Sequence, residues 1–154
     1  MRSPESQTLD SLVRIYPFCK RLLLHTPWHV NDLTGTQRLI LLTSAVCGEL
    51  TMTCLADTIA CSKEQATRAV APLVQAGYLK RIYDRQNRTR VFIELTPEGR
   101  ALIRQQYEAC TQELHRLFAA LSPEDRDRLT QSLQTIYQLL GHLQPEIAKA
   151  GDSL

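Results

Sequence analysis

The chain has 154 residues, of which 44% are apolar and 22% are charged, and its net charge is +2. This composition excludes a disordered chain and indicates a soluble globular protein, either one domain or one compact module with an attached oligomerisation element. No apolar run approaches the roughly 20 residues of a membrane span, and the start lacks the apolar stretch of a secretory signal, so we expect a cytoplasmic protein with no membrane partner.

Residues 1–32 are expected to form an N-terminal helix that contributes to dimerisation. Apolar residues recur at helical spacing from Leu9 to Leu24. The polar stretch from Met1 to Thr8 contains a proline and is expected to be frayed. Pro17 removes a backbone donor, which predicts a kink or a restart of the helix at that residue.

A second helix is predicted from the cap residue Thr34 to about Cys47, where Gly48 ends it. Its spacing predicts that three apolar side chains face inward, namely Leu39, Leu42 and Val46. The following stretch, Glu49 to Thr51, is predicted to be a short extended piece.

Two short helices follow, Thr53 to Ala60 and Ser62 to Ala76, joined by a tight turn. Ser62 and Gln65 have the spacing of a capping box, and Gly77 stands where a left-handed residue ends a helix. The second helix has one apolar stripe, which leaves a polar, donor-rich face for a partner.

A two-stranded hairpin is predicted next, because the apolar period changes to two. One strand spans Tyr78 to Tyr83, and Val91, Ile93 and Leu95 alternate along the other. The tip, Asp84-Arg85-Gln86-Asn87-Arg88, combines turn-forming residues with two arginines, so it should be exposed and cationic. Thr96 and Pro97 then begin a new helix as cap and first-turn residue.

Residues 97–150 carry two long helices with heptad seams, the first to about Leu121 and the second from Ser122 onward. The first is roughly 37 Å long, more than a domain of this size needs for its own core. Self-association through these helices is therefore the simplest way to cover the seams, with a helical hairpin inside one monomer as the alternative. The residues predicted to dimerise are Leu114, Leu117, Leu121, Leu133, Ile136 and Leu140.

The positive charge is concentrated in the middle of the chain. The segment from Ser62 to Val91 contains seven basic and two acidic residues, which gives a net charge of +5. The rest of the chain therefore has a net charge of −3. A focused basic segment favours a polyanion partner over a uniformly solvated surface.

Helix, turn, capped helix and basic hairpin is the order of a winged helix-turn-helix, so residues 33–96 are predicted to bind double-stranded DNA. In the major groove, arginine side chains can hydrogen-bond to guanine and glutamine side chains to adenine. The free backbone N–H groups at the start of a helix favour binding of a phosphate. Arginines of the hairpin are of the type that enters a narrow minor groove. The candidate DNA contacts are Ser62, Lys63, Gln65, Thr67, Arg68, Arg81, Arg85, Arg88 and Arg90.

About Leu33 to Leu102 resembles the MarR (multiple antibiotic resistance) regulators. Leu50 to Ala56 is similar to the start of that family's helix-turn-helix, and Leu73 to Leu79 is similar to the end of its second helix. Leu95-Thr96-Pro97-Glu98-Gly99 is the most specific match. The predicted fold is mostly α-helical with a small β-hairpin wing. The resemblance implies N- and C-terminal helices that pair as a homodimer, and we predict that such a dimer binds a pseudo-palindromic operator in successive major grooves.

The wing departs from the family pattern, because Asn87-Arg88-Thr89 stands where Asp-x-Arg is usual. Arg88 or Arg90 is therefore expected to supply that contact.

The resemblance also implies regulation by a signal. Family members commonly lose DNA affinity when small aromatic or phenolic ligands bind between the DNA-binding part and the dimer helices, which would make this chain a ligand-responsive repressor. Tyr16, His25 and Trp28 are candidates to line such a pocket. Cys19 resembles in its placement the reactive cysteine of the peroxide-sensing branch, although Gly35 to Arg38 replace that branch's tyrosines.

Other classes of function find less support in the sequence. The five cysteines are odd in number and lack metal-finger spacing, so neither a metal nor another cofactor is expected. The chain has no nucleophile elbow, no Walker or dinucleotide glycine motif and no His-Glu-x-x-His, so we do not expect an enzyme. An oxidation-sensing regulator and a winged-helix protein-interaction module that does not touch DNA remain as alternatives.

Overall fold

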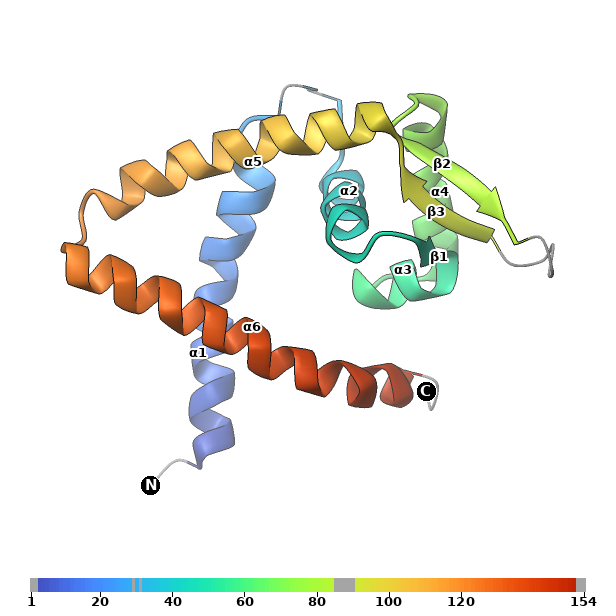
Figure 1. Cartoon of the computed structure of the whole chain (residues 1–154). Helices are drawn as coiled ribbons and strands as arrows, with labels where there is room; N and C mark the ends of the chain where they lie inside the picture. The colour runs from blue at the N-terminus through green and yellow to red at the C-terminus, as the bar shows by residue number, and fades with distance from the viewer. Residues whose placement is uncertain (1–2, 29, 31, 85–90, 152–154) are drawn as a thin grey trace. The chain divides into compact units, whose positions relative to one another are not determined.

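The computed structural model describes residues 3–28, 30, 32–84 and 91–151, with side chains up to residue 141. The described chain is mostly helical and has one small antiparallel sheet, which confirms the predicted fold class (Figure 1). It divides into two compact units, Met1–Glu113 and Leu114–Leu154, which are treated separately below. None of the described helices is both long enough and apolar enough to cross a lipid bilayer. The division into 1–32, 33–96 and 97–150 stays a prediction.

The N-terminal helix α1 spans Pro4–Lys20 and continues into the π-helical turn η1, Arg21–His25. Its start is ordered by Ser3, whose hydroxyl accepts from the N–H of Ser6 at 3.3 Å, so the expected fraying of residues 4–8 is wrong. The helix also passes through Pro17 without a restart, and the wider turn comes four residues later. None of the residues of α1 or η1 is buried.

Helix α2, Gly35–Cys47, begins and ends as its sequence predicts. Thr34 and Gln37 form a reciprocal capping box, and Gly48 follows the helix with φ +73°. The predicted buried face is wrong for Val46, which is 66% exposed, whereas Leu42 is half-buried against the core and Leu39 is half-buried. Helix α2 packs against η1, α3, α4 and β3, so neighbours on several sides determine which of its side chains are buried: Gln37, Ile40, Leu41 and Ser44.

The sheet has three strands in the order β1-β3-β2, not the two of a simple hairpin. Strand β1, Leu50–Thr51, is the extended piece after α2, and it pairs with β3, Val91–Leu95, through Leu50 opposite Ile93. Strand β2, Leu79–Tyr83, pairs with the other edge of β3. A two-residue strand is too short to show a period of its own, so its pairing cannot be read from the spacing of apolar residues.

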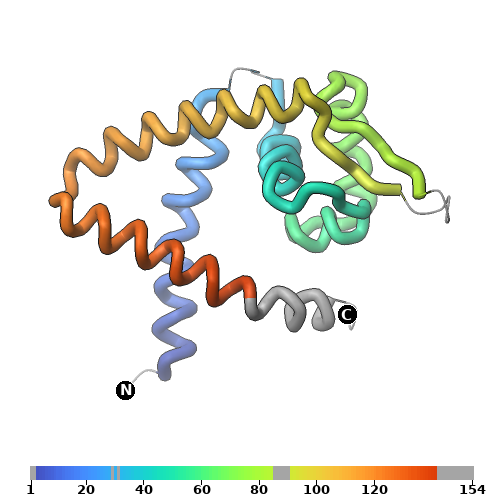
Figure 2. The backbone as a smooth tube through the Cα atoms, viewed as in Figure 1, coloured from blue at the N-terminus to red at the C-terminus, as the bar shows by residue number. Residues whose placement is uncertain are grey.

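One core joins the central elements of the first unit. It contains Ile40 and Leu41 of α2, Leu73 of α4, and Leu79 and Ile93 of the sheet, all at most 1% exposed. Helix α5, Pro97–Phe118, starts one residue after β3 (Figure 2). Its Leu102 and Ile103 belong to this core. The core therefore fixes α4 and the β2–β3 hairpin on one body.

The second unit consists of the end of α5, a short turn and helix α6, Pro123–Gly151. Helix α5 ends three residues before the predicted Leu121. Ser122 caps α6, since its hydroxyl accepts from the N–H of Asp125 at 3.1 Å. No side chain of α6 up to residue 141 is buried.

Candidate nucleic-acid interface

Helices α3, Met52–Thr58, and α4, Lys63–Gln75, form the helix-turn-helix. Thr51 caps α3 by accepting from the N–H of Cys54 at 3.1 Å. The turn between the helices passes through Ala60, whose φ of +53° lies in the left-handed region. The N–H of Cys61 then donates to the carbonyl of Ala56 at 3.0 Å. The turn is thus closed by backbone bonds and directs the chain into the second helix.

Helix α4 is capped at both ends as predicted. The N–H of Gln65 donates to the Ser62 hydroxyl at 3.2 Å, and the N–H of Ser62 donates to the Gln65 side-chain oxygen at 3.0 Å. At the other end Gly77 has φ +79°, the left-handed conformation that glycine tolerates. Ala66, Val70 and Leu73 are buried, so the helix is attached to the core by one side.

The opposite side of α4 is exposed and polar. Lys63, Gln65, Thr67 and Arg68 all lie on the surface. Two of them are already engaged: the Gln65 side-chain oxygen accepts from Ser62, and the Thr67 hydroxyl donates to the carbonyl of Lys63 at 2.7 Å. Arg68 makes no hydrogen bond or salt bridge within the described residues. The Lys63 ammonium makes none there either, so the Arg68 guanidinium and the Lys63 ammonium are the donors of this face that are most available to a partner.

Glu64 is a functional feature that the sequence analysis missed. Its own backbone N–H, and then the Ser62 hydroxyl, hold the pKa of the Glu64 carboxyl below its ordinary value. The carboxylate is therefore charged at neutral pH and occupies the start of α4, where the sequence predicts a bound phosphate. A phosphate near Ser62 and Lys63 would have to displace Glu64.

The strands of the wing carry a mixed set of charges. Arg81 of β2 is exposed, as a DNA contact requires. Its neighbour Lys80 forms an ion pair with Glu94 of β3 at 2.8 Å, so Lys80 adds less to the positive field than its place in the sequence suggests. The other three candidate wing contacts, Arg85, Arg88 and Arg90, lie outside the described residues.

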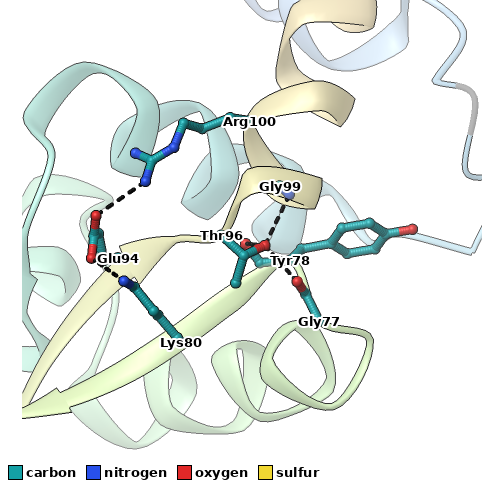
Figure 3. A network of polar contacts seen from close by, with 7 residues as sticks. All are labelled: Gly77, Tyr78, Lys80, Glu94, Thr96, Gly99 and Arg100. Carbon is teal, nitrogen blue, oxygen red and sulfur yellow. Dashed lines mark hydrogen bonds and ion pairs between the residues drawn. The ribbon is translucent and has the colours of Figure 1, made fainter.

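The base of the wing is joined to the start of α5 by two sets of polar contacts (Figure 3). Glu94 pairs with Lys80 and also with Arg100 of α5, at 3.2 Å, and these two cations lower the pKa of its carboxyl. The Thr96 hydroxyl donates to the carbonyl of Gly77 at 2.5 Å and accepts from the N–H of Gly99 at 3.0 Å. The hairpin and α5 are thus held at a common point.

Gly99 permits the closest backbone approach at this point. A Cβ atom on Gly99 would lie 2.1 Å from the carbonyl oxygen of Tyr78 and 2.8 Å from the Leu95 side chain. A glycine at this position lets the first turn of α5 lie directly on the residue that precedes β2.

The residues proposed for a ligand pocket lie in different environments. Tyr16 is 63% exposed and His25 is exposed, whereas Trp28 is only 4% exposed and belongs to the core. The Gln106 amide of α5 is oriented so that its nitrogen meets an acceptor and its oxygen meets a donor. In this orientation the Gln106 side-chain oxygen accepts from the Trp28 indole N–H at 3.2 Å. The guanidinium of Arg38 lies 5.9 Å from the centre of the Trp28 ring. Trp28 therefore has packing partners of its own, and a ligand contact by these three residues stays a prediction.

Two cavities of the first unit are lined by other residues. A cavity of about 710 Å³ lies between the start of α2 and the face of α4 that carries Gln65 and Arg68. A smaller cavity of about 350 Å³ lies between the end of α2 and the start of α5. Neither is lined by Tyr16, His25 or Trp28.

The cysteines are all free thiols. Cys19 is half-buried in α1, so its thiol has some access to solvent, and its redox role stays a prediction. Among the described side chains, no three histidine, cysteine or carboxylate groups gather as metal ligands do.

The residues predicted to dimerise include large apolar side chains on the surface. Four are exposed in the single chain, namely Leu117, Leu133, Ile136 and Leu140, and Leu114 and Leu121 are half-buried. Helix α1 carries a comparable exposed set, namely Leu9, Leu12, Val13 and Tyr16. Exposed apolar groups of this number indicate an interaction surface.

Comparisons with known proteins agree with this architecture. No protein-family model matches the chain. The HTH-type transcriptional regulator YfiV of Bacillus subtilis, itself described as uncharacterised, is 24% identical over 119 residues, which cover 77% of this chain and 74% of YfiV.

Solved structures match most of the length of the chain. RV1404 from Mycobacterium tuberculosis matches with a TM-score of 0.76 and 22% identity, over 92% of this chain and 97% of that protein. MarR from E. coli matches with a TM-score of 0.68 and 24% identity, over 83% and 95%. FabT from Streptococcus pneumoniae, solved in complex with DNA, matches with a TM-score of 0.60 and 18% identity, over 90% and 96%. The chain has the fold of the MarR regulators, which confirms the resemblance seen in the sequence at the level of fold.

Proposed function

We propose that this chain is a sequence-specific, double-stranded-DNA-binding transcriptional regulator of the MarR type that acts as a homodimer. The observation that carries the proposal is the orientation of α4, which buries Ala66, Val70 and Leu73 and leaves Lys63 and Arg68 exposed. A rigid helix with a free polar face and an adjacent hairpin suits insertion into the major groove. The fold shared with FabT, whose structure contains DNA, supports the same interpretation.

In this proposal Arg68 reads a base edge, Lys63 and Arg81 contact phosphates, and the wing arginines Arg85, Arg88 and Arg90 reach an adjacent groove. Ser62, Gln65 and Thr67 orient the helix start, and their side chains exchange intrahelical bonds for DNA contacts on binding. The chain then has no catalytic role, in keeping with the description of its relative YfiV as a transcriptional regulator.

Binding to DNA should depend steeply on salt, because cations that contact phosphates release condensed counterions. For a dimer with six or more phosphate contacts, we expect the affinity to fall by about three orders of magnitude between roughly 50 and 200 mM salt. Fluorescence anisotropy with a duplex selected from a random pool would measure this slope. A protein-interaction module that does not touch DNA would select no duplex, and that result would refute the proposal.

The dimer should be detectable directly. We expect light scattering at micromolar concentration to give twice the mass of one chain, because the exposed apolar side chains of α1 and α6 need a partner. Ile136→Asp should lower the dimer affinity at least about tenfold, since it places a charge among apolar groups. Gln134→Asp, a neighbouring exposed position, is the control. A wild-type monomer at this concentration would contradict the proposal.

The dimer we propose places two recognition helices about 34 Å apart, one helical turn of DNA, which predicts a pseudo-palindromic operator. The finer proposal is a cytoplasmic repressor that releases DNA when a small ligand binds, as the family resemblance implies. Oxidation at Cys19 is the alternative signal. If Cys19 is the sensor, peroxide should release DNA from the wild type but not from Cys19→Ser.

A further inference from the structure

Helix α4 carries an acidic residue near the middle of its exposed face. Its buried side consists of Ala66, Val70 and Leu73. Successive residues of an α-helix are about 100° apart around the axis, so Glu64 and Arg68 point away from this buried side, and both are exposed. When such a helix enters the major groove, these two side chains are the ones that come nearest to the base edges.

The start of α4 does not need Glu64 as a cap. An acidic residue in the first turn ordinarily serves the helix itself, by binding the free backbone N–H groups there. Helix α1 has this arrangement, since the Ser3 hydroxyl and the backbone N–H of Glu5 lower the pKa of the Glu5 carboxyl. Helix α4 has in addition the reciprocal capping box of Ser62 and Gln65, which closes its first turn without an acidic side chain.

The charge of Glu64 is unfavourable on DNA unless a hydrogen-bond donor receives it. Phosphates repel a carboxylate, and the groove removes part of its water. Its own backbone N–H and the Ser62 hydroxyl hold the pKa of the Glu64 carboxyl below its ordinary value, so the group stays ionised at neutral pH. An ionised carboxylate can only accept hydrogen bonds, and the partner of Glu64 must therefore be a donor on a base.

The major groove offers two such donors, the N4 amino group of cytosine and the N6 amino group of adenine. The adenine amino group lies between two acceptors, its own N7 and the O4 of the paired thymine, and both repel a carboxylate. The cytosine amino group has one neighbouring acceptor, the O6 of the paired guanine, and arginine is the side chain that binds this oxygen. A glutamate one turn before an arginine therefore favours cytosine.

We propose that Glu64 selects cytosine, on the basis of the DNA-binding function proposed above: its carboxylate accepts a hydrogen bond from the cytosine N4 amino group. Arg68 follows one turn later on the same face. Four residues advance about 6 Å along the helix, less than two base-pair steps of about 3.4 Å each. The cytosine bound by Glu64 thus lies within two base pairs of the guanine bound by Arg68, and each half of the operator contains both.

The selected base should change with the residue at this position. Selection from a random duplex pool should give cytosine at one position of each half-site for the wild type and adenine at that position for Glu64→Gln, because glutamine forms a bidentate pair with adenine. Anisotropy should show at least about a tenfold preference for cytosine in the wild type, reversed in Glu64→Gln. Glu64→Ala should show no preference there and keep the other positions.

Glu5→Gln is the matched control, because it removes a carboxylate from the same position of a capped helix outside the helix-turn-helix. It should select the same sequence as the wild type. Both glutamine variants should lower the melting temperature slightly and to a similar extent, since each loses a charge that favours a helix start. A stabilising role alone would therefore change the melting temperature but not the selected base.

A base analogue tests the hydrogen bond itself. Pyrimidin-2-one lacks the amino group of cytosine, so placing it at the selected position should weaken binding of the wild type by about tenfold. Binding of Glu64→Ala should not change, and this variant corrects for any effect of the analogue on the duplex.

Two results would overturn the assignment: Glu64→Gln selects the wild-type sequence with the same stringency, or pyrimidin-2-one weakens the wild type and Glu64→Ala equally. Failure of the proposed function looks different, because the wild type and Glu5→Gln would then enrich no duplex at all. That result would refute DNA binding, and the selection of cytosine with it.

Discussion

Replacing Gly99 by alanine should lower the free energy of unfolding by about 3 kcal/mol, because there is no room for a Cβ atom at this position. The added Cβ would lie 2.1 Å from the carbonyl oxygen of Tyr78, which is backbone and has little freedom to move. The same oxygen accepts from the N–H of Thr96 at 3.1 Å, so a shift of the helix would also disturb the contact between α5 and the hairpin. The gain in helix propensity, about 1 kcal/mol, opposes but does not cancel this cost.

Urea unfolding at one fixed protein concentration measures the change, and a fall in melting temperature of roughly 8 °C should accompany it. Gly35→Ala is a matched control, since Gly35 also lies in the first turn of a helix but a Cβ atom added there would meet nothing within 4 Å. Its effect should stay within about 0.5 kcal/mol. A Gly99→Ala protein as stable as Gly35→Ala would show that the backbones do not approach as closely as described.

Arg68→Ala should reduce discrimination between the preferred duplex and duplexes changed at one base pair by about 10- to 100-fold. Arg68 is exposed and makes no hydrogen bond or salt bridge within the described chain, so its truncation should leave the melting temperature unchanged. Arg68→Lys should keep most of the salt-dependent affinity but not the discrimination, because an ammonium cannot form the planar pair of bonds that a guanidinium forms with guanine.

Selection from a random duplex pool, followed by anisotropy with single-base variants, measures this discrimination. Lys63→Ala is the comparison: a phosphate contact should weaken all duplexes alike and reduce the salt slope by about one. If Arg68→Ala selected the same sequence with the same stringency as wild type, Arg68 would not read a base.

The parts of the fold that could be predicted from sequence are those whose cause is local. The capping box of Ser62 and Gln65 and the left-handed Gly77 each depend on residues a few positions apart, and the structure confirms all of them. The buried residues of α2 depend instead on several neighbours, so the spacing of apolar residues finds Leu42, which packs against the core, but wrongly places Val46 inside.

The site was predictable to a similar extent. The exposure of Lys63 and Arg68 follows from the apolar stripe of one helix, which can be seen in the sequence. The ion pair between Glu94 and Arg100 arises where β3 meets α5, and no spacing along the chain indicates it. The Glu64 side chain could have been suspected, because an acidic residue in the first turn of a helix favours the amides there.

Helix α1 has no buried side chain, and it contains a proline well inside its length. A 17-residue helix in water is close to the limit at which it forms by itself, so little in one isolated chain holds it. If the pairing proposed here is what covers its apolar side, folding of this segment and assembly are one equilibrium governed by mass action. The concentration of the protein would then determine what fraction of it has a folded N-terminal segment. A low concentration would by itself regulate the protein.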